Sequence, residues 1–143
     1  MLFRITDRPI SPDALHNEVV HSADGAVVTF CGVVRDHSGG RRTDYLVYEA
    51  YTEMAERKMA EIGQDVAKRF GVSDVAILHR VGRLEIGDVS VLIAVASPHR
   101  AEAFAACHHA TDRLKEVVPI WKKEVGEDGG VWVEGPRVLR AGA

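Results

Sequence analysis

The chain has 143 residues, of which 46% are hydrophobic and 27% are charged. This is the composition of one globular domain with a buried core, and it excludes a disordered chain. The net charge of -3 gives no overall positive field for nucleic acid, so an anion site must be built locally. Cys31 and Cys107 are too few for a disulfide framework. With no apolar signal segment and no run of roughly 20 apolar residues, we expect a cytoplasmic protein without a membrane span.

The N-terminal part of the chain predicts strands with one early helix. Leu2–Ile5 is a short predicted strand, and Ser11–Asp13 predicts the start of a helix, because serine caps helices and proline fits the first turn. The apolar run Ala26–Val34 is too continuous for a half-exposed strand, so we expect it in the centre of a sheet. Asp36–Thr43 is a polar loop that we expect to be mobile, and Asp44–Tyr51 alternates as a second strand does.

The middle of the chain predicts a helix and a hairpin. Apolar residues recur at helical spacing from Ala55 to Phe70, and Gly71 is placed to end that helix. Val75–Leu84 and Val89–Ala96 are predicted strands, joined as a hairpin across residues 85–88.

A second long helix is predicted after Ser97, ending at Pro119. Its predicted inward stripe has 3-4-3-4 spacing and consists of Phe104, Cys107, Thr111, Leu114 and Val118. A short strand at 131–133 and a loose tail at 136–143 complete the chain. Because strands and helices do not alternate strictly, we expect a single α+β domain, residues 1–143, with a mixed sheet packed against helices.

The segment Ser97-Pro98-His99-Arg100 is the strongest candidate for a binding site. A cation in the first turn of a helix opposes the helix dipole by about 0.3–1 kcal/mol. Arg100 also lies four residues before Phe104, on the predicted inward stripe. An anion bound at this helix end would account for both features, although an ion pair with a nearby carboxylate is the alternative.

Other cations have both functional and ordinary interpretations. Arg35 ends a predicted strand before a glycine-containing loop, where ligand contacts are common, but a lone arginine there is more often a solvated rim residue. Phe30 could be core or could floor a flat ligand. Lys115 has a simple alternative partner in Asp112. Residues 122–123 are two lysines that Pro119 and Trp121 could hold against the body of the protein.

The remaining histidines and cysteines predict no metal or cofactor site. His108 and His109 are adjacent, so on a helix their side chains point about 100° apart and cannot share a metal. His79 precedes Arg80 on a predicted strand and is interpreted as part of a structural or interface pair. Cys31 is predicted in the core of the sheet and Cys107 in the core of a helix.

Five sequence blocks in register resemble the large, catalytic subunit of molybdopterin synthase. They are GAVVTF at 25–30 with Gly32 and Arg35, LVYEAY at 46–51, HRVGRL at 79–84 with Gly87 and Asp88, SPHR at 97–100, and PIWKKE at 119–124. The resemblance covers nearly all of residues 1–134. It implies an α/β-hammerhead fold and a homodimer. Each protomer would also bind a small ubiquitin-like sulfur-carrier subunit, giving a heterotetramer.

The resemblance also implies a reaction and a set of site residues. The family converts cyclic pyranopterin monophosphate to molybdopterin, and two sulfurs come from the C-terminal Gly-Gly thiocarboxylate of the carrier. By the positions that match, the resemblance implies that Lys115 and Lys122 are catalytic. It also implies a set of substrate-binding residues: Phe30, Val33, Val34, Arg35, His99, Arg100, Lys123 and Glu124. Some family members carry a basic residue at position 33, where Val33 can contribute only its main chain.

Two other functions are compatible with parts of the sequence. A non-catalytic module could bind the carrier or a phosphate ligand without turnover, but the presence of both Lys115 and Lys122 favours catalysis. Nucleic-acid binding through Arg41 and Arg42 is disfavoured, because the chain is acidic and no aromatic residues alternate with these arginines. The enzyme interpretation requires the cations at 35, 99–100, 115 and 122 to converge on one cavity, either within one chain or through symmetry or a partner chain.

Overall fold

A computed structural model describes residues 1–127 and 129–134, with the backbone alone at 131, 133 and 134. The first of its two four-stranded sheets has the order β1-β6-β8-β2. Its strands are β1 (Leu2–Thr6), β2 (Ala26–Val33), β6 (Asp74–Arg80) and β8 (Val89–Ser97). β1 is parallel to β6, and the other pairs are antiparallel, so this sheet is mixed.

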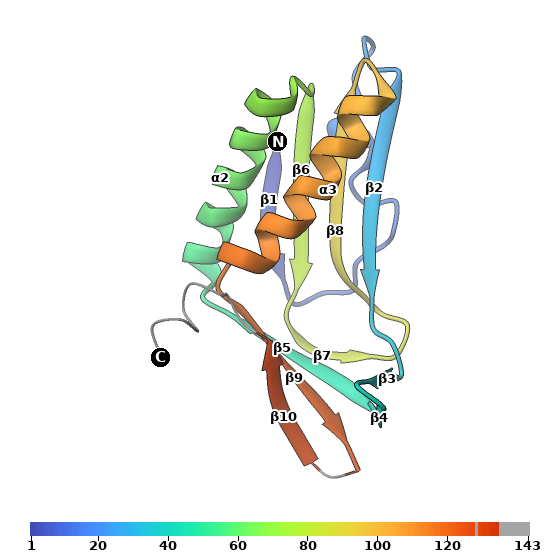
Figure 1. Ribbon diagram of the computed structural model, residues 1–143, viewed down its shortest axis with the longest axis vertical. Coiled ribbons are helices and arrows are strands. Elements are labelled where there is room, and N and C mark those ends of the chain that lie inside the picture. The colour runs from blue at the N-terminus through green and yellow to red at the C-terminus, as the bar shows by residue number, and fades with distance from the viewer. Residues whose placement is uncertain (128, 135–143) are drawn as a thin grey trace.

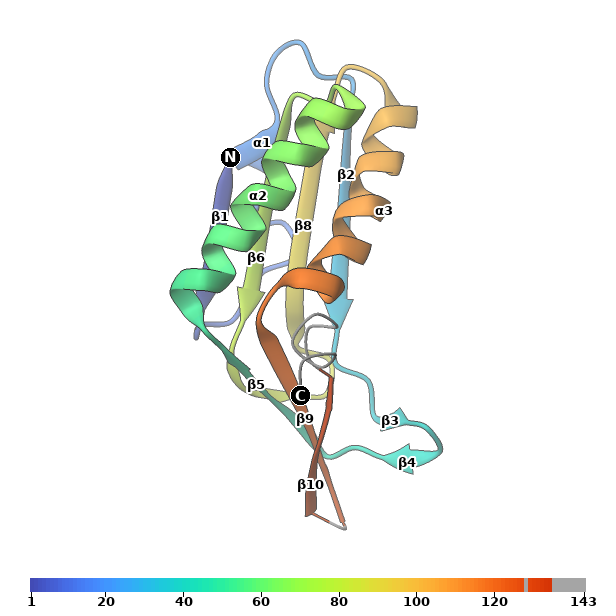
Figure 2. The same cartoon turned by 60° about the vertical axis from the view of Figure 1, so that its left-hand side comes forward.

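Helices cover both faces of the first sheet, and this explains its apolar strands. The long helices α2 (Thr52–Phe70) and α3 (Arg100–Val117) lie side by side on one face (Figure 1). The short helix α1 (His16–Val19) lies on the other face (Figure 2). All nine residues of β8 are therefore buried. Gly63 of α2 lets the helix approach the sheet, because a Cβ there would stand 2.1 Å from the Phe3 ring.

The second sheet lies at one end of the first and has the order β10-β9-β5-β7 (Figure 1). Its strands are β5 (Tyr45–Ala50), β7 (Gly82–Glu85), β9 (Ile120–Gly126) and β10 (Gly129–Glu134), and all its pairs are antiparallel. A two-stranded ribbon of β3 (His37–Ser38) and β4 (Arg41–Arg42) projects beside it (Figure 2). Over the two described ranges, no helix combines the length and apolar character needed to cross a bilayer.

Several predictions of local structure are confirmed. The helix from residue 52 to 70 buries Ala55, Met59, Ile62 and Val66, and it ends at Gly71, whose φ of 69° is left-handed. The helix after Ser97 is also present. The mixed α+β architecture is confirmed, whereas the extent of the domain to residue 143 stays a prediction, because the tail at 136–143 lies outside the described residues.

The predicted position of Ala26–Val34 was wrong. Its strand, β2, is at the edge of the first sheet, and Phe30 and Val33 are 37% and 57% exposed. A continuous apolar run indicates that both faces of a strand can be covered, but it does not say which strands pair with it. The central strands are β6 and β8.

The predicted hairpin between Val75–Leu84 and Val89–Ala96 is confirmed only in part: β6 and β8 are antiparallel neighbours, but the turn at 85–88 does not join them directly. The first segment divides at Val81 into β6, which pairs with β8 in the first sheet, and β7, which pairs with β5 in the second. Gly82 has a φ of 93°, which allows the chain to change direction where it leaves the first sheet. Local turn residues at 85–88 form a turn, but the strands on either side of it belong to different sheets.

Three smaller predictions need correction. Residues 12–15 form turns, so α1 begins at His16 and not beside Ser11. The expected loop at 36–43 contains the ribbon β3–β4, and residues 120–126 form a strand that the sequence did not predict. Phe104 is exposed, because α3 buries smaller residues against the sheet: Ala103, Ala106, Cys107, Ala110 and Leu114.

Candidate active site

A cavity of about 390 Å³ opens where the first sheet, the end of α3 and the second sheet meet. Its polar lining consists of Arg35, Tyr48, His79, Ser90, Lys115 and Lys122. Its remaining walls are Phe30, Cys31, Gly32, Val33, Val91, Leu114, Val118 and Ile120. Among the described residues that line it, three are cations and none is a carboxylate. The cavity is therefore suited to an anionic molecule with an apolar part.

The cations of the cavity come from three different elements. Arg35 follows the end of β2, Lys115 is in the last turn of α3, and Lys122 is on β9. Lys122 is directly opposite Tyr48 of β5 in the sheet register, so both side chains are on the same face. The structure thus brings together five of the predicted site residues: Phe30, Val33, Arg35, Lys115 and Lys122.

Main-chain hydrogen bonds fix the position of the chain just before Arg35, where it leaves the first sheet. Val34 is buried, and its N–H donates to the carbonyl of Asp88 at 3.0 Å. The N–H of Gly87 donates in turn to the carbonyl of Val34 at 2.7 Å. The turn between β7 and β8 therefore holds the residue that precedes Arg35 from both sides, and Val34 has a supporting position in this arrangement.

The two cavity lysines have different surroundings. The Nζ of Lys122 is 3.7 Å from Oε1 of Glu124, and these side chains are only 20% and 17% exposed. Lys115 is exposed, and it forms no ion pair within the described residues. Its alternative partner from the sequence, Asp112, lies 3.6 Å from His108 instead. Lys115 can therefore meet a ligand without first breaking a contact with Asp112.

His79 and Cys31 belong to the cavity, which the sequence did not predict. The interpretation of Cys31 as sheet core was wrong, because it is half-buried on the edge strand that forms one wall. Cys107 is in the core as predicted, and burial raises the pKa of its thiol. Two signals in the sequence could have pointed to His79: it is a histidine at the end of an otherwise apolar strand, and it begins the block at 79–84 that resembles the family.

His99 and Arg100 do not reach this cavity within one copy of the chain. Both are exposed at the start of α3, and Arg100 is about 22 Å along the helix axis from Lys115 at 1.5 Å per residue. The inward position expected for Arg100 was wrong for the same reason as that of Phe104: α3 presents its alanine-rich face to the sheet. A single protomer therefore gathers only part of the predicted cation cluster.

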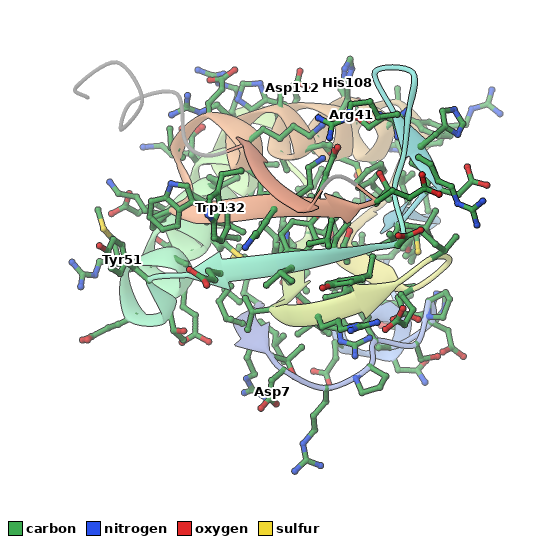
Figure 3. All side chains as sticks on the ribbon, turned by 90° about the horizontal axis from the view of Figure 1, so that it is seen from below. Asp7, Arg41, Tyr51, His108, Asp112 and Trp132 are labelled. Carbon is green, nitrogen blue, oxygen red and sulfur yellow. The ribbon has the colours of Figure 1, made fainter. Side chains whose placement is uncertain are left out.

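Lys123 faces away from the cavity, because consecutive residues of a strand point to opposite faces. Its Nζ lies 5.8 Å from the centre of the Trp132 ring on β10. Figure 3 shows Trp132 and Tyr51 at this end of the molecule. Glu124, two residues after Lys122, shares the face of the second sheet that carries Lys122.

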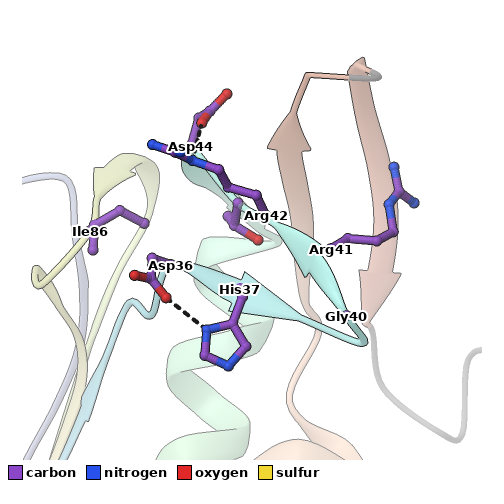
Figure 4. Close-up of a pocket in the computed structure, with 8 residues that line it drawn as sticks. Asp36, His37, Gly40, Arg41, Arg42, Asp44 and Ile86 are labelled. Carbon is purple, nitrogen blue, oxygen red and sulfur yellow. Dashed lines mark hydrogen bonds and ion pairs between the residues drawn. The ribbon is translucent and has the colours of Figure 1, made fainter.

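A second, open concavity of about 570 Å³ lies between the ribbon and the turn that carries Ile86 (Figure 4). Its charges are largely paired. His37 is 2.7 Å from Asp36, and this hydrogen bond lowers the pKa of the Asp36 carboxyl. Arg42 is 3.6 Å from Asp44. Arg41 points away from the Asp36–His37 pair (Figure 4). Mixed and paired charges do not form the basic surface that nucleic acid requires.

Within the described residues, no group of three His, Cys, Asp or Glu could hold a metal.

Comparison with known proteins identifies the family. The family model described as MoaE protein matches residues 5–117. The chain belongs to the MoaE family. A MoaE relative named molybdopterin synthase catalytic subunit from Halalkalibacterium halodurans is 53% identical over 131 residues, which cover 92% of this chain and 84% of the relative. Another of the same name from Staphylococcus carnosus is 49% identical, covering 92% and 87%.

Solved structures confirm the fold. Molybdopterin synthase from Staphylococcus aureus has a TM-score of 0.88 and 46% identity, covering 92% of this chain and 96% of that one. A chain from a Helicobacter pylori complex of subunits 1 and 2 of molybdopterin-converting factor is only 20% identical, and its TM-score of 0.76 shows a shared fold over 91% of this chain and 88% of that one. The α+β fold expected from the MoaE-type sequence blocks is therefore present.

Proposed function

We propose that this chain is the catalytic subunit of a molybdopterin synthase, an enzyme of molybdenum cofactor biosynthesis. As a sulfurtransferase, it moves sulfur from the thiocarboxylated C-terminus of a small carrier subunit to cyclic pyranopterin monophosphate, forming the dithiolene of molybdopterin. The observation that carries this proposal is the cavity in which Arg35, Lys115 and Lys122 meet an apolar wall, in a chain of the MoaE family. Its two free thiols suit a reducing cytoplasm.

The residues of the cavity match the needs of this reaction. A thiocarboxylate sulfur is already a nucleophile, so the subunit needs no cysteine of its own for the attack. It must orient the reactants, stabilise negative charge as the cyclic phosphate opens, and move protons. Arg35 is placed to hold the phosphate, and Lys115 and Lys122 to act at the sulfur-transfer centre. Water then releases the carrier as a carboxylate.

The proposed partner is a small ubiquitin-like protein ending in Gly-Gly. The Helicobacter pylori structure is a complex of two subunits of molybdopterin-converting factor, which supports an equivalent partner for this chain. An extended Gly-Gly terminus has no side chains, so it can enter a cavity of about 390 Å³ beside a pterin.

We further propose that a homodimer completes the site. β2 is an edge strand with exposed apolar residues, and such an edge is a template for pairing. The start of β2 is beside residue 97, because Ala26 pairs with Ser97. The end of β2 leads to Arg35 at the cavity. A two-fold axis that pairs two copies of β2 antiparallel would place residues 97–100 of the second copy near Arg35 of the first. His99 and Arg100 would then join the phosphate site from across the interface.

The function is tested by reconstitution. The purified chain is mixed with thiocarboxylated carrier and cyclic pyranopterin monophosphate, and molybdopterin is measured as its fluorescent oxidation product. Product is expected only when both substrates are present. If folded protein still binds the carrier but forms no product, the alternative interpretation, a non-catalytic binding module, would replace the enzyme interpretation.

The shared site is tested by mixing two variants, Arg100→Ala and Lys122→Ala, at a pterin concentration so low that each variant alone forms little product. If each site uses Arg100 of one copy and Lys122 of the other, random reassociation restores about a quarter of the sites. If activity does not recover although mass spectrometry verifies that subunits have exchanged, either one protomer supplies both residues to a site or the two residues do not share a site. Arg100→Ala alone should mainly raise the KM for the pterin.

A further inference from the structure

The two walls of the cavity belong to different sheets. Arg35 and His79 come from the first sheet, whereas Tyr48 and Lys122 come from the second. The chain passes from one sheet to the other at Val81, immediately after β6. The distance across the cavity therefore depends on how the two sheets are held together at this corner.

His79 is buried at that corner, with only 4% of its surface exposed. Its Nδ1 is 2.9 Å from the carbonyl oxygen of Arg80. Because a carbonyl can only accept, Nδ1 carries a proton and donates it. The ring is thereby fixed in orientation. A buried polar ring in an apolar strand costs free energy, so packing alone is a poor reason for a histidine at this position.

The His79 ring contacts Tyr48 of the second sheet. The ring centres are 5.0 Å apart and the planes are inclined at 74°, an edge-to-face contact. In the second sheet, Tyr48 is paired with Gly82 on one side and with Lys122 on the other. Gly82 has no side chain to cover the tyrosine, which leaves that side of the ring to His79. Lys122 lies on the opposite side, at the short Cβ separation of about 4.5–5.5 Å typical of paired residues.

We propose that His79 is a positioning residue of the cavity, which acts through Tyr48 to set the direction of the Lys122 amine. The proposal rests on the proposed function only in giving Lys122 a part in sulfur transfer. His79 connects the sheet that carries Arg35 to the sheet that carries Lys122. Loss of the His79 ring lets Tyr48 move, and the lysine then loses one wall of its site.

The first test measures the lysine directly and needs no turnover. The amine of Lys122 is labelled with a small acylating reagent across a range of pH, and the rate is read by mass spectrometry, with exposed Lys68 as the internal standard. His79→Ala should change the rate at Lys122 by about threefold or more relative to Lys68, because the lysine's surroundings change. His79→Phe, which keeps a ring against Tyr48, should recover part of the parent behaviour.

The second test is kinetic. With the carrier and pterin as substrates, His79→Ala should lower kcat on the order of 10²-fold, the cost of misplacing a reacting group by about 1 Å, and change KM by less than about threefold. The matched control is His109→Ala. His109 also contacts an aromatic ring, that of Phe70 at 5.6 Å, and lies 3.1 Å from Arg69, but it does not line the cavity. That control should leave both kcat and the labelling rate unchanged.

The outcomes separate the two proposals. A folded His79→Ala variant with parent-like Lys122 labelling and parent-like kcat would overturn the positioning role and leave only packing. If His79→Ala does not fold, Tyr48→Leu decides by the same measurements, and parent-like values in that variant would overturn the proposal. If the parent makes no molybdopterin, the proposed function fails. The labelling rate at Lys122 still tests whether His79 positions the Lys122 amine.

Discussion

Asp88 offers a test of how the fold holds the cavity, because one of its oxygens has two partners. Oδ2 accepts the N–H of Glu85 at 2.9 Å and lies 3.2 Å from Nη1 of Arg80. The Arg80 side chain is only 15% exposed, whereas that of Asp88 is 36% exposed. Asp88→Asn keeps the shape and an oxygen for Glu85, so it removes mainly the charge that partners the mostly buried Arg80.

The expected cost lies between two limits. Breaking a fully buried pair costs about 3–5 kcal/mol, and exposed pairs contribute about 0–1 kcal/mol. Because solvent reaches Asp88, we expect Asp88→Asn to lower the free energy of unfolding by about 2 kcal/mol. With an m-value of about 2 kcal/mol/M, the urea midpoint should fall by about 1 M. The KM for the pterin should rise, since the same turn holds Val34 beside Arg35.

The double variant Arg80→Met/Asp88→Asn is the control for this prediction. It removes the buried cation together with its partner, and we expect it to regain most of the lost stability, because no uncompensated charge remains inside. A single Asp88→Asn variant whose unfolding free energy is within about 0.5 kcal/mol of the parent would refute the reasoning, since that is the range of an ordinary surface substitution.

Three further predictions concern catalysis, the thiols and the core. Lys115→Ala and Lys122→Ala should each lower molybdopterin formation by about 10²–10⁴-fold while the melting temperature stays close to that of the parent; a folded variant with full activity would remove that lysine from the mechanism. A thiol reagent should label Cys31 rapidly and Cys107 only after unfolding, because burial raises the pKa of Cys107. Equal labelling rates for the two cysteines would contradict the structure. The Cys31→Ser variant should keep the activity of the parent. Met59→Ala should lower the free energy of unfolding in urea by about 2–5 kcal/mol, because Met59 is fully buried on the inner face of α2; a smaller loss would mean that the core collapses around the gap.

The long helices and the mixed α+β class could be predicted, because they depend on local periodicity and helix-ending residues. The helix at 52–70 and its end at Gly71 follow from apolar spacing and a left-handed glycine. The sheet positions could not be predicted in the same way. Ala26–Val34 was expected in the centre and is at the edge, and the strand after Val75 changes sheet at Val81. Pairing between strands distant in sequence is not encoded in the pattern of either strand alone.

The candidate site, like the fold, could be predicted from the sequence only in part. The residue types that could bind an anion and transfer sulfur were evident from the sequence alone, because Arg35 and Lys122 lie in blocks that resemble the MoaE-type enzymes and Lys115 matches a catalytic position of that family. Long-range packing was needed to show which of these residues share a cavity, that His79 joins it, and that His99 and Arg100 are a helix length away. The physical reason is that chemistry belongs to individual side chains, whereas convergence depends on how sheets and helices pack at long range.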